Sequence, residues 1–134
     1  MHHHRLLLIS LFLVLAGCTS LSAKSRMDQY EKIALGYERA MTWSDFALAY
    51  SATKAAQASQ LLPDASGYAD IKVTSYEPAT PQLSQEGMTI KRVARIQYVH
   101  TTRMAELSLV TEEEWRYSDE AGRWFLYSGF PKFK

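Results

Sequence analysis

The sequence predicts an α+β domain in which N-terminal helices pack on one face of a curved antiparallel sheet of three to four strands. Two observations predict it. Between residues 27 and 59, apolar side chains recur every three or four residues, which is the spacing of one helical face. After Gly67 the pattern changes to period two, with β-branched and aromatic residues. Two helices followed by antiparallel strands indicate an α+β fold.

Residues 1–17 have the pattern of a bacterial lipoprotein signal peptide. An apolar run from Leu6 to Leu15 stops short of the about 20 apolar residues that a transmembrane helix needs. It ends in Leu15-Ala16-Gly17-Cys18, which contains the only cysteine of the chain and resembles the lipobox cut by the lipoprotein signal peptidase. The resemblance implies that Cys18 is lipidated and anchors the mature chain in a membrane. An ordinary secretory signal followed by a chance cysteine is the alternative.

The residue after the lipidated cysteine is Thr19. In Gram-negative lipoproteins an Asp at this position favours retention in the inner membrane, so the resemblance implies an outer-membrane protein that faces the periplasm. Residues 19–26 are small and polar and predict a tether that spans about 27 Å at most when fully extended. The domain, residues 27–134, is therefore expected close to the membrane surface.

The composition allows one domain with one hydrophobic core. The whole chain has a formal net charge of +1, and loss of Arg5 with the signal peptide leaves the mature chain neutral. We therefore expect no nucleic acid partner.

The first helix is predicted from Met27 to Met41, with the apolar residues between them on one face. The second is predicted to begin at Thr42, in a capping box variant that Asp45 completes, and to run to about Ser59. The segment containing Pro63 would end it.

Period-two patterns predict four strands. The first covers residues 71–77 and ends before Pro78, because proline cannot donate a hydrogen bond to a sheet ladder. The second covers residues 88–98 and has one apolar face, on which Arg92 is the exception. The third covers residues 105–117 and alternates between apolar side chains and a polar outer face.

The last strand is predicted for residues 123–130, after a hairpin turn at Asp119-Glu120-Ala121-Gly122 in which Gly122 can adopt positive φ. Three segments of the chain, "YEKIALGYERAMTWSDFALAY", "DIKVTSYE" and "EEEWRYSDEAGRWFLYSGFPKF", resemble small proteobacterial lipoproteins with an NTF2-like, cone-shaped (SnoaL-like) domain. The resemblance covers about residues 27–133 and implies the fold more than an activity, because this fold hosts both enzymes and scaffolds.

Enzymes of the NTF2-like class move a proton with an Asp, His or Tyr inside the cone, and the candidates here are Asp70, Tyr98 and His100, with Arg92 as a further possible pocket residue. Asp70 and Arg92 are expected to form an ion pair or a polar floor, with a structural role favoured over a catalytic one. His100 is the only histidine of the mature chain, and a solvent-facing position in a turn is favoured over a general base.

Metals and cofactors are not expected. In Glu112-Glu113-Glu114 the strand alternation points Glu113 away from its neighbours, which prevents convergence on a metal ion. The sequence has no Gly-rich phosphate loop and no nucleophile elbow.

The sequence therefore predicts a non-enzymatic envelope lipoprotein that binds or scaffolds another envelope protein or a small apolar ligand. A pocket enzyme of the isomerase or dehydratase type is the alternative. We also predict a homodimer through the outer sheet face, where basic Lys91 and Arg95 of the second strand would meet acidic Glu106, Glu112 and Glu114 of the third. The alternative is that these opposite charges face each other across neighbouring strands of one chain, which would stabilise a monomer equally well.

Overall fold

The computed structural model describes the backbone of residues 2–134 and the side chains from Ser22 onward. A long helix, α1 (His2–Thr42), is followed by the short helix α2 (Phe46–Tyr50), 3-10 turns at Ala55–Gln57 and Ala65–Tyr68, and the strands β1 (Ile71–Pro78), β2 (Gln82–Leu83), β3 (Thr89–His100), β4 (Ala105–Ser118) and β5 (Arg123–Leu126). The predicted lipidation of Cys18 falls outside the described side chains. No helix in the described part of the chain is long and apolar enough to cross a membrane.

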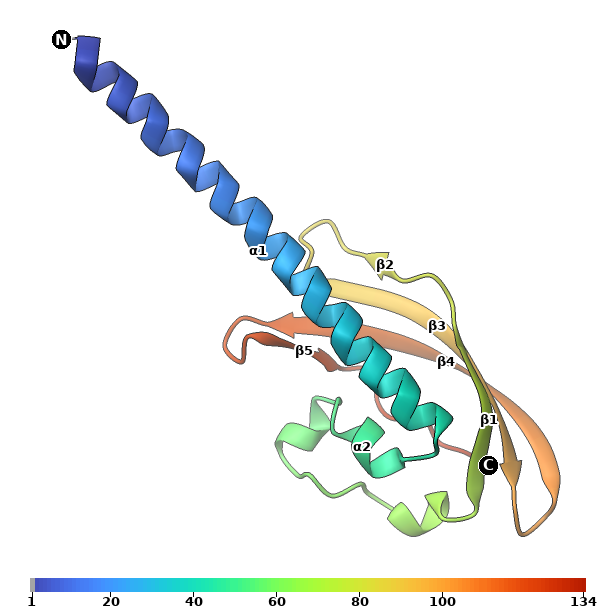
Figure 1. The fold of residues 1–134 in the computed structure, drawn as a ribbon. Coiled ribbons are helices and arrows are strands. Elements are labelled where there is room, and N and C mark those ends of the chain that lie inside the picture. Colours follow the sequence, from blue (N-terminus) through green and yellow to red (C-terminus); the bar gives the residue numbers. More distant parts are fainter. Residues whose placement is uncertain (1) are drawn as a thin grey trace.

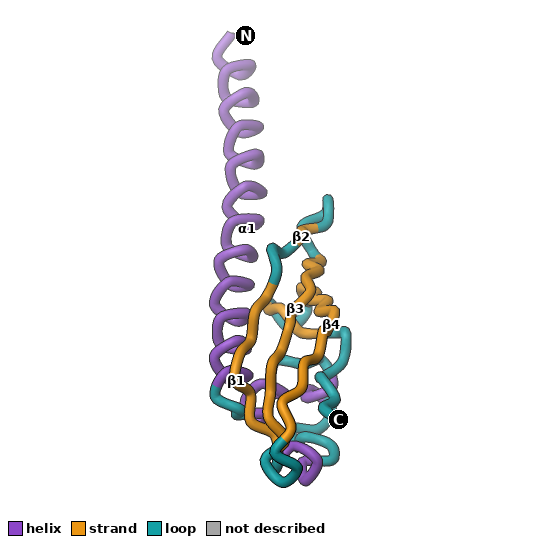
Figure 2. The backbone as a smooth tube through the Cα atoms, turned by 90° about the vertical axis from the view of Figure 1, so that its right-hand side faces the viewer, coloured by secondary structure: helices purple, strands orange, loops and turns teal. Residues whose placement is uncertain are grey.

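The sheet is antiparallel, has the order β1-β3-β4-β5 and carries β2 on the edge of β3. It is strongly curled, and the C-terminal half of α1 lies across its concave face (Figure 1). Seen along the sheet, α1 stands on one side of the strands (Figure 2). The predicted fold class, helices on a curved antiparallel sheet, is confirmed, and the arrangement is consistent with an NTF2-like fold.

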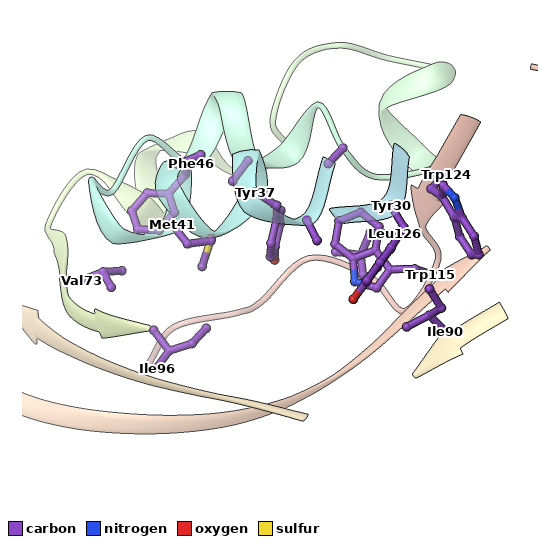
Figure 3. Packing of buried hydrophobic residues seen from close by; sticks show 14 of the residues in the cluster. Tyr30, Tyr37, Met41, Phe46, Val73, Ile90, Ile96, Trp115, Trp124 and Leu126 are labelled. Atoms are coloured by element: carbon purple, nitrogen blue, oxygen red, sulfur yellow. The ribbon is translucent and has the colours of Figure 1, made fainter. Parts of the chain in front are cut away.

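The core lies between α1 and the concave face (Figure 3). Tyr30, Tyr37 and Met41 of α1 point toward Ile96 and Trp115 of the strands, and all five are buried. Alternation along the strands explains why the sheet has one apolar face, because successive side chains point to opposite sides. The predicted inward faces of the second and third strands are confirmed.

The predicted tether is helical, because the backbone of residues 19–26 continues α1. Its last residue, Arg26, already contacts the sheet: its carbonyl accepts a hydrogen bond from Trp124 Nε1 at 2.7 Å. Four residues of this segment, 22–25, have exposed side chains. The sheet therefore begins to hold the helix at Arg26.

The predicted second helix, from Thr42 to Ser59, is wrong in both bounds. Asp45 caps α2 by accepting from Leu48 N at 3.1 Å, whereas the Thr42 hydroxyl donates to the Glu38 carbonyl. α2 ends at Tyr50 because the chain then pairs with the edge of β5, where Lys54 N donates to the Leu126 carbonyl at 2.8 Å. Tertiary pairing here overrides helix propensity.

Two strand ends also differ from prediction. β1 includes Pro78 as its last residue, which is paired with Ala94. β5 ends at Leu126 rather than Phe130. On the outer face, Lys91 lies opposite Glu114 of the same chain, which is the arrangement expected for the monomeric alternative.

Candidate functional site

A buried polar network interrupts the apolar concave face. Arg92 of β3 and Glu113 of β4 are direct neighbours across the two strands, and both side chains point inward because of the strand alternation. Tyr76 of β1 joins them from the other side of β3, and Glu38 of α1 reaches them from the helix. The network thus links α1 to three strands of the sheet, β1, β3 and β4.

Glu113 is the centre of the network and is 2% exposed. Its Oε1 accepts from Arg92 Nε and Nη2, both at 3.1 Å, and from Trp115 Nε1 at 3.0 Å. Its Oε2 accepts a short hydrogen bond from the Tyr76 hydroxyl, which in turn accepts from Arg92 Nη2 at 3.3 Å. Glu38 Oε1 lies 3.9 Å from Arg92 Nη1 and supplies a second, more distant carboxylate. A buried ion pair in this geometry has its hydrogen bonds satisfied, as burial of charge requires.

Two tyrosines of α1 cover the network and fill the concave space. Tyr37 packs edge-on against Trp115, with ring centroids 5.4 Å apart, and also against Tyr76 at 6.1 Å. Tyr30 packs against Trp115 at 6.0 Å and Trp124 at 5.6 Å. The hydroxyls of Tyr30 and Tyr37 are buried and have no hydrogen-bond partner among the described residues. Aromatic packing therefore stabilises these two side chains in the core, although each buries a hydroxyl without a hydrogen bond, which is destabilising.

The network changes the ionisation of its members. Burial raises the pKa of Tyr76 far above its usual value of 10.0, and the adjacent Glu113 carboxylate raises it further. Burial and Glu113 also raise the pKa of Tyr37. Burial lowers the pKa of Arg92, but the charge and hydrogen bond of Glu113, together with Tyr76 and Tyr30, outweigh it and the net change is upward. The guanidinium is therefore charged and both phenols are neutral across the physiological range.

The structure does not bring the four predicted site residues together. Asp70 lies at the opposite end of β3 from Arg92, where its carbonyl accepts from Thr101 N at 2.8 Å. The predicted Asp70–Arg92 ion pair is therefore wrong, since the ion-pair partners of Arg92 among the described residues are Glu113 and Glu38.

Tyr98 and His100 lie at the Asp70 end of β3. Tyr98 is buried against Phe133, and its hydroxyl accepts from Lys134 N at 3.2 Å. His100 is partly exposed beside the turn, and its Nδ1 lies 2.9 Å from Thr102 Oγ1. No carboxylate orients its ring among the described contacts, which is what the solvent-facing interpretation expects.

Sequence reasoning missed Glu113, Tyr76 and Glu38 as partners of Arg92. The sequence did contain a signal for Glu113. The strand alternation that predicts an inward Arg92 also points Glu113 away from Glu112 and Glu114, toward the core. A buried charge is costly without an opposite charge beside it, so two opposite charges that both face inward on adjacent strands are expected to pair. Tyr76 had no such signal, because a β-bulge between Val73 and Ser75 shifts the register of β1.

Several hollows mark the surface. One of about 360 Å³ lies against the outer face and is lined by Lys91, Val93 and Glu112. A larger, open groove of about 770 Å³ runs beside the α1–α2 turn and the start of β1, and includes Trp43 and Lys72. No group of three or more potential metal ligands occurs among the described residues.

Comparison with known proteins returned no matching family model, no matching curated protein and no matching solved structure.

Proposed function

We propose that this chain is an envelope lipoprotein, anchored through Cys18, whose NTF2-like domain is a non-enzymatic binding or scaffold module. The lipobox-like sequence supports the anchor, and Thr19 directly after Cys18 favours the outer membrane, facing the periplasm, as the destination. The curled sheet under a long helix supports the assignment to the NTF2-like class.

The observation that carries the binding role is the filled interior of the cone. Tyr30, Tyr37 and Trp115 occupy the space in which an enzyme of this fold class would hold its substrate. The charged groups there, Arg92 and Glu113, are hydrogen-bonded to each other and to their neighbours. A cone filled by aromatic rings, with its charged groups paired, favours binding through the outer surface over catalysis in an inner pocket. A pocket enzyme would instead need Asp70, Tyr98 or His100 to converge on an open cavity.

The anchor is tested by replacing Cys18 with Ser and labelling cells with a palmitate analogue. We expect the label to disappear and the protein to leave the membrane fraction, because the thiol is the acceptor for the acyl chains. Thr19→Ser is the matched control and should keep both label and membrane fraction. A Cys18→Ser protein that stays membrane-bound to the same extent would contradict the anchor.

A third variant tests the destination. Thr19→Asp should remain labelled but move from the outer to the inner membrane in a Gram-negative host. Equal distribution of Thr19→Asp and Thr19→Ser between the two membranes would contradict the predicted sorting.

A further inference from the structure

A hollow of about 480 Å³ lies between the end of α2, the segment 55–68 and the C-terminal residues 130–133. None of the residues that fill the concave space lines it. Its volume is in the range of sites that hold small molecules. Four aromatic residues from these three segments form its walls: Tyr50, Tyr68, Phe130 and Phe133. We call it the aromatic hollow.

The walls of the aromatic hollow are held in place by contacts with one another. Tyr68 packs against Phe130 and Phe133, with ring centroids 5.6 and 5.9 Å apart, and Tyr50 packs edge-on against Phe130 at 5.7 Å. The Tyr68 hydroxyl donates to the Pro131 carbonyl at 2.9 Å and so ties the segment 55–68 to the C-terminal segment. A site that is formed before the ligand arrives loses less entropy on binding.

Ring walls favour an aromatic ligand over an aliphatic ligand of the same size. Aromatic rings attract each other edge to face, and this attraction adds to the effect of the apolar area that they bury. Leu62 and Pro63 complete the apolar part of the lining. The walls of the hollow therefore select a planar aromatic group.

The lining also contains one acidic and one basic residue, Asp64 and Lys132. Both side chains are exposed, and neither forms an ion pair among the described residues. Asp64 acts on the aromatic wall, since burial and then the charge of Asp64 raise the pKa of Tyr68. A ligand with complementary charges has one positive and one negative group, so that each of the two side chains gains a partner.

We propose that the aromatic hollow binds a small aromatic zwitterion of the amino acid class. The ligand ring lies among the four aromatic walls, its ammonium group faces Asp64, and its carboxylate faces Lys132. This inference rests on the proposed non-enzymatic binding role and deepens it by naming a ligand class and a site. It does not depend on lipidation at Cys18.

The test uses the full chain in phosphatidylcholine nanodiscs and para-fluoro-phenylalanine as the probe. The fluorine NMR signal of the probe should broaden and shift when the probe is bound, and empty nanodiscs give the background. We expect a dissociation constant between about 0.1 and 2 mM, which is ordinary for a ligand of this size.

Competition with unlabelled compounds tests each part of the ligand. Phenylalanine should displace the probe, and cyclohexylalanine, which has the same charges but no aromatic ring, should be at least about fivefold weaker. Phenylethylamine lacks the carboxylate and phenylpropionate lacks the ammonium group, so each should be about threefold weaker than phenylalanine. The uncharged N-acetyl-phenylalanine amide represents a phenylalanine side chain of a partner protein and should be the weakest of the aromatic compounds.

Gly67→Leu should abolish binding of the probe. Gly67 lines the hollow and a Cβ placed on it would meet nothing within 4 Å, so a leucine side chain can fill the space without a clash. The matched control is Gly36→Leu on the exposed face of α1, where a Cβ likewise meets nothing within 4 Å, and this variant should bind normally. Urea unfolding verifies that both variants are folded.

Two further variants test the charges without filling the hollow. Asp64→Asn should remove the preference for phenylalanine over phenylpropionate, and Lys132→Gln should remove the preference over phenylethylamine. Both residues are exposed, and asparagine tolerates the positive φ of Asp64, so the fold should be unchanged. The controls Asp28→Asn and Lys32→Gln make the same changes on exposed residues of α1 and should keep both preferences.

Equal displacement of the probe by cyclohexylalanine or by the uncharged amide would overturn the proposal, and so would normal binding by Gly67→Leu. Preferences that Asp64→Asn and Lys132→Gln leave unchanged would also overturn it. A probe that binds in the hollow but is recovered chemically altered would support the site and contradict the non-enzymatic role. Palmitate labelling at Cys18 is measured separately, so a failure of the ligand site is distinguishable from a failure of the anchor.

Discussion

Replacing Glu113 with Gln should destabilise the domain by about 3 kcal/mol. Glutamine keeps the shape and one acceptor oxygen, but it removes the charge that faces Arg92 at 3.1 Å inside the core. Removal of one partner from a buried ion pair typically costs about 3 to 5 kcal/mol, because the other charge is left uncompensated. We expect the lower end of this range, since Glu38 lies 3.9 Å from Arg92 Nη1 and offsets part of the loss.

A double-mutant cycle separates the pair from the rest of the network. In Arg92→Met with Glu113→Gln both charges are gone, while the amide oxygen can still accept from Trp115 Nε1 and the amide nitrogen can donate to the Tyr76 hydroxyl. The double variant should therefore be more stable than Glu113→Gln alone, with a coupling of about 2 kcal/mol.

The assay is urea unfolding followed by the emission of the buried tryptophans, with stability read from the midpoint at constant slope. The matched control is Glu112→Gln on the exposed outer face, which should change stability by less than about 0.5 kcal/mol. A loss below about 1 kcal/mol in Glu113→Gln, or a double variant whose loss equals the sum of the single losses, would refute the reasoning.

The buried tyrosines and tryptophans and the oligomeric state give further tests. Tyr37→Phe should be neutral or stabilising by about 1 kcal/mol in urea unfolding, because its buried hydroxyl has no described partner, whereas Tyr76→Phe should lose about 1 to 3 kcal/mol. Because the folded state raises the pKa of both phenols above 10.0, it keeps protons that the unfolded state releases, so stability should fall as pH rises above about 10 and fall less steeply in Tyr37→Phe. Trp115→Ala and Trp124→Ala should each cost about 3 to 5 kcal/mol, and losses under about 0.5 kcal/mol at both sites would place the rings on the surface. Sedimentation of the unlipidated domain, residues 19–134, decides between the predicted dimer through the outer sheet face and the monomer, and a monomer at about tens of micromolar would end the dimer prediction.

The strands were predictable because one face of each is buried. A shift of one residue would turn the apolar side chains of a strand to the solvent, so the alternation fixes which side chains face the core. The ends of β3 and β4 were accordingly predicted to within a few residues. The second helix was not predictable in the same way. Its sequence favours a helix to Ser59, but Thr53 and Lys54 pair with Leu126, a residue far along the chain, and only the tertiary structure reveals that competition.

The site was half predictable. Arg92 was identified as the exception on an apolar face, and an uncompensated charge there would be too costly to bury. Its partner was assigned to Asp70 because both were thought to lie on the core side. The ladder pairs Arg92 with Glu113 instead, and it places Asp70 beside Thr101. The pairing of β3 with β4 thus determines the partner of Arg92, which the sequence pattern of each single strand does not reveal.

The size of two side chains on α1 decides whether this fold has an interior pocket. Tyr30 and Tyr37 lie two turns apart on the buried face and reach the same ring, Trp115. Smaller residues there would leave an apolar cavity above a charged pair, and each cubic ångström of cavity costs about 24 cal/mol. The tyrosines avoid that cost but bury two hydroxyls that bind nothing among the described residues. The two tyrosines therefore keep the concave space filled with aromatic rings, while Leu35 on the same helix and Trp43 directly after it are exposed to solvent.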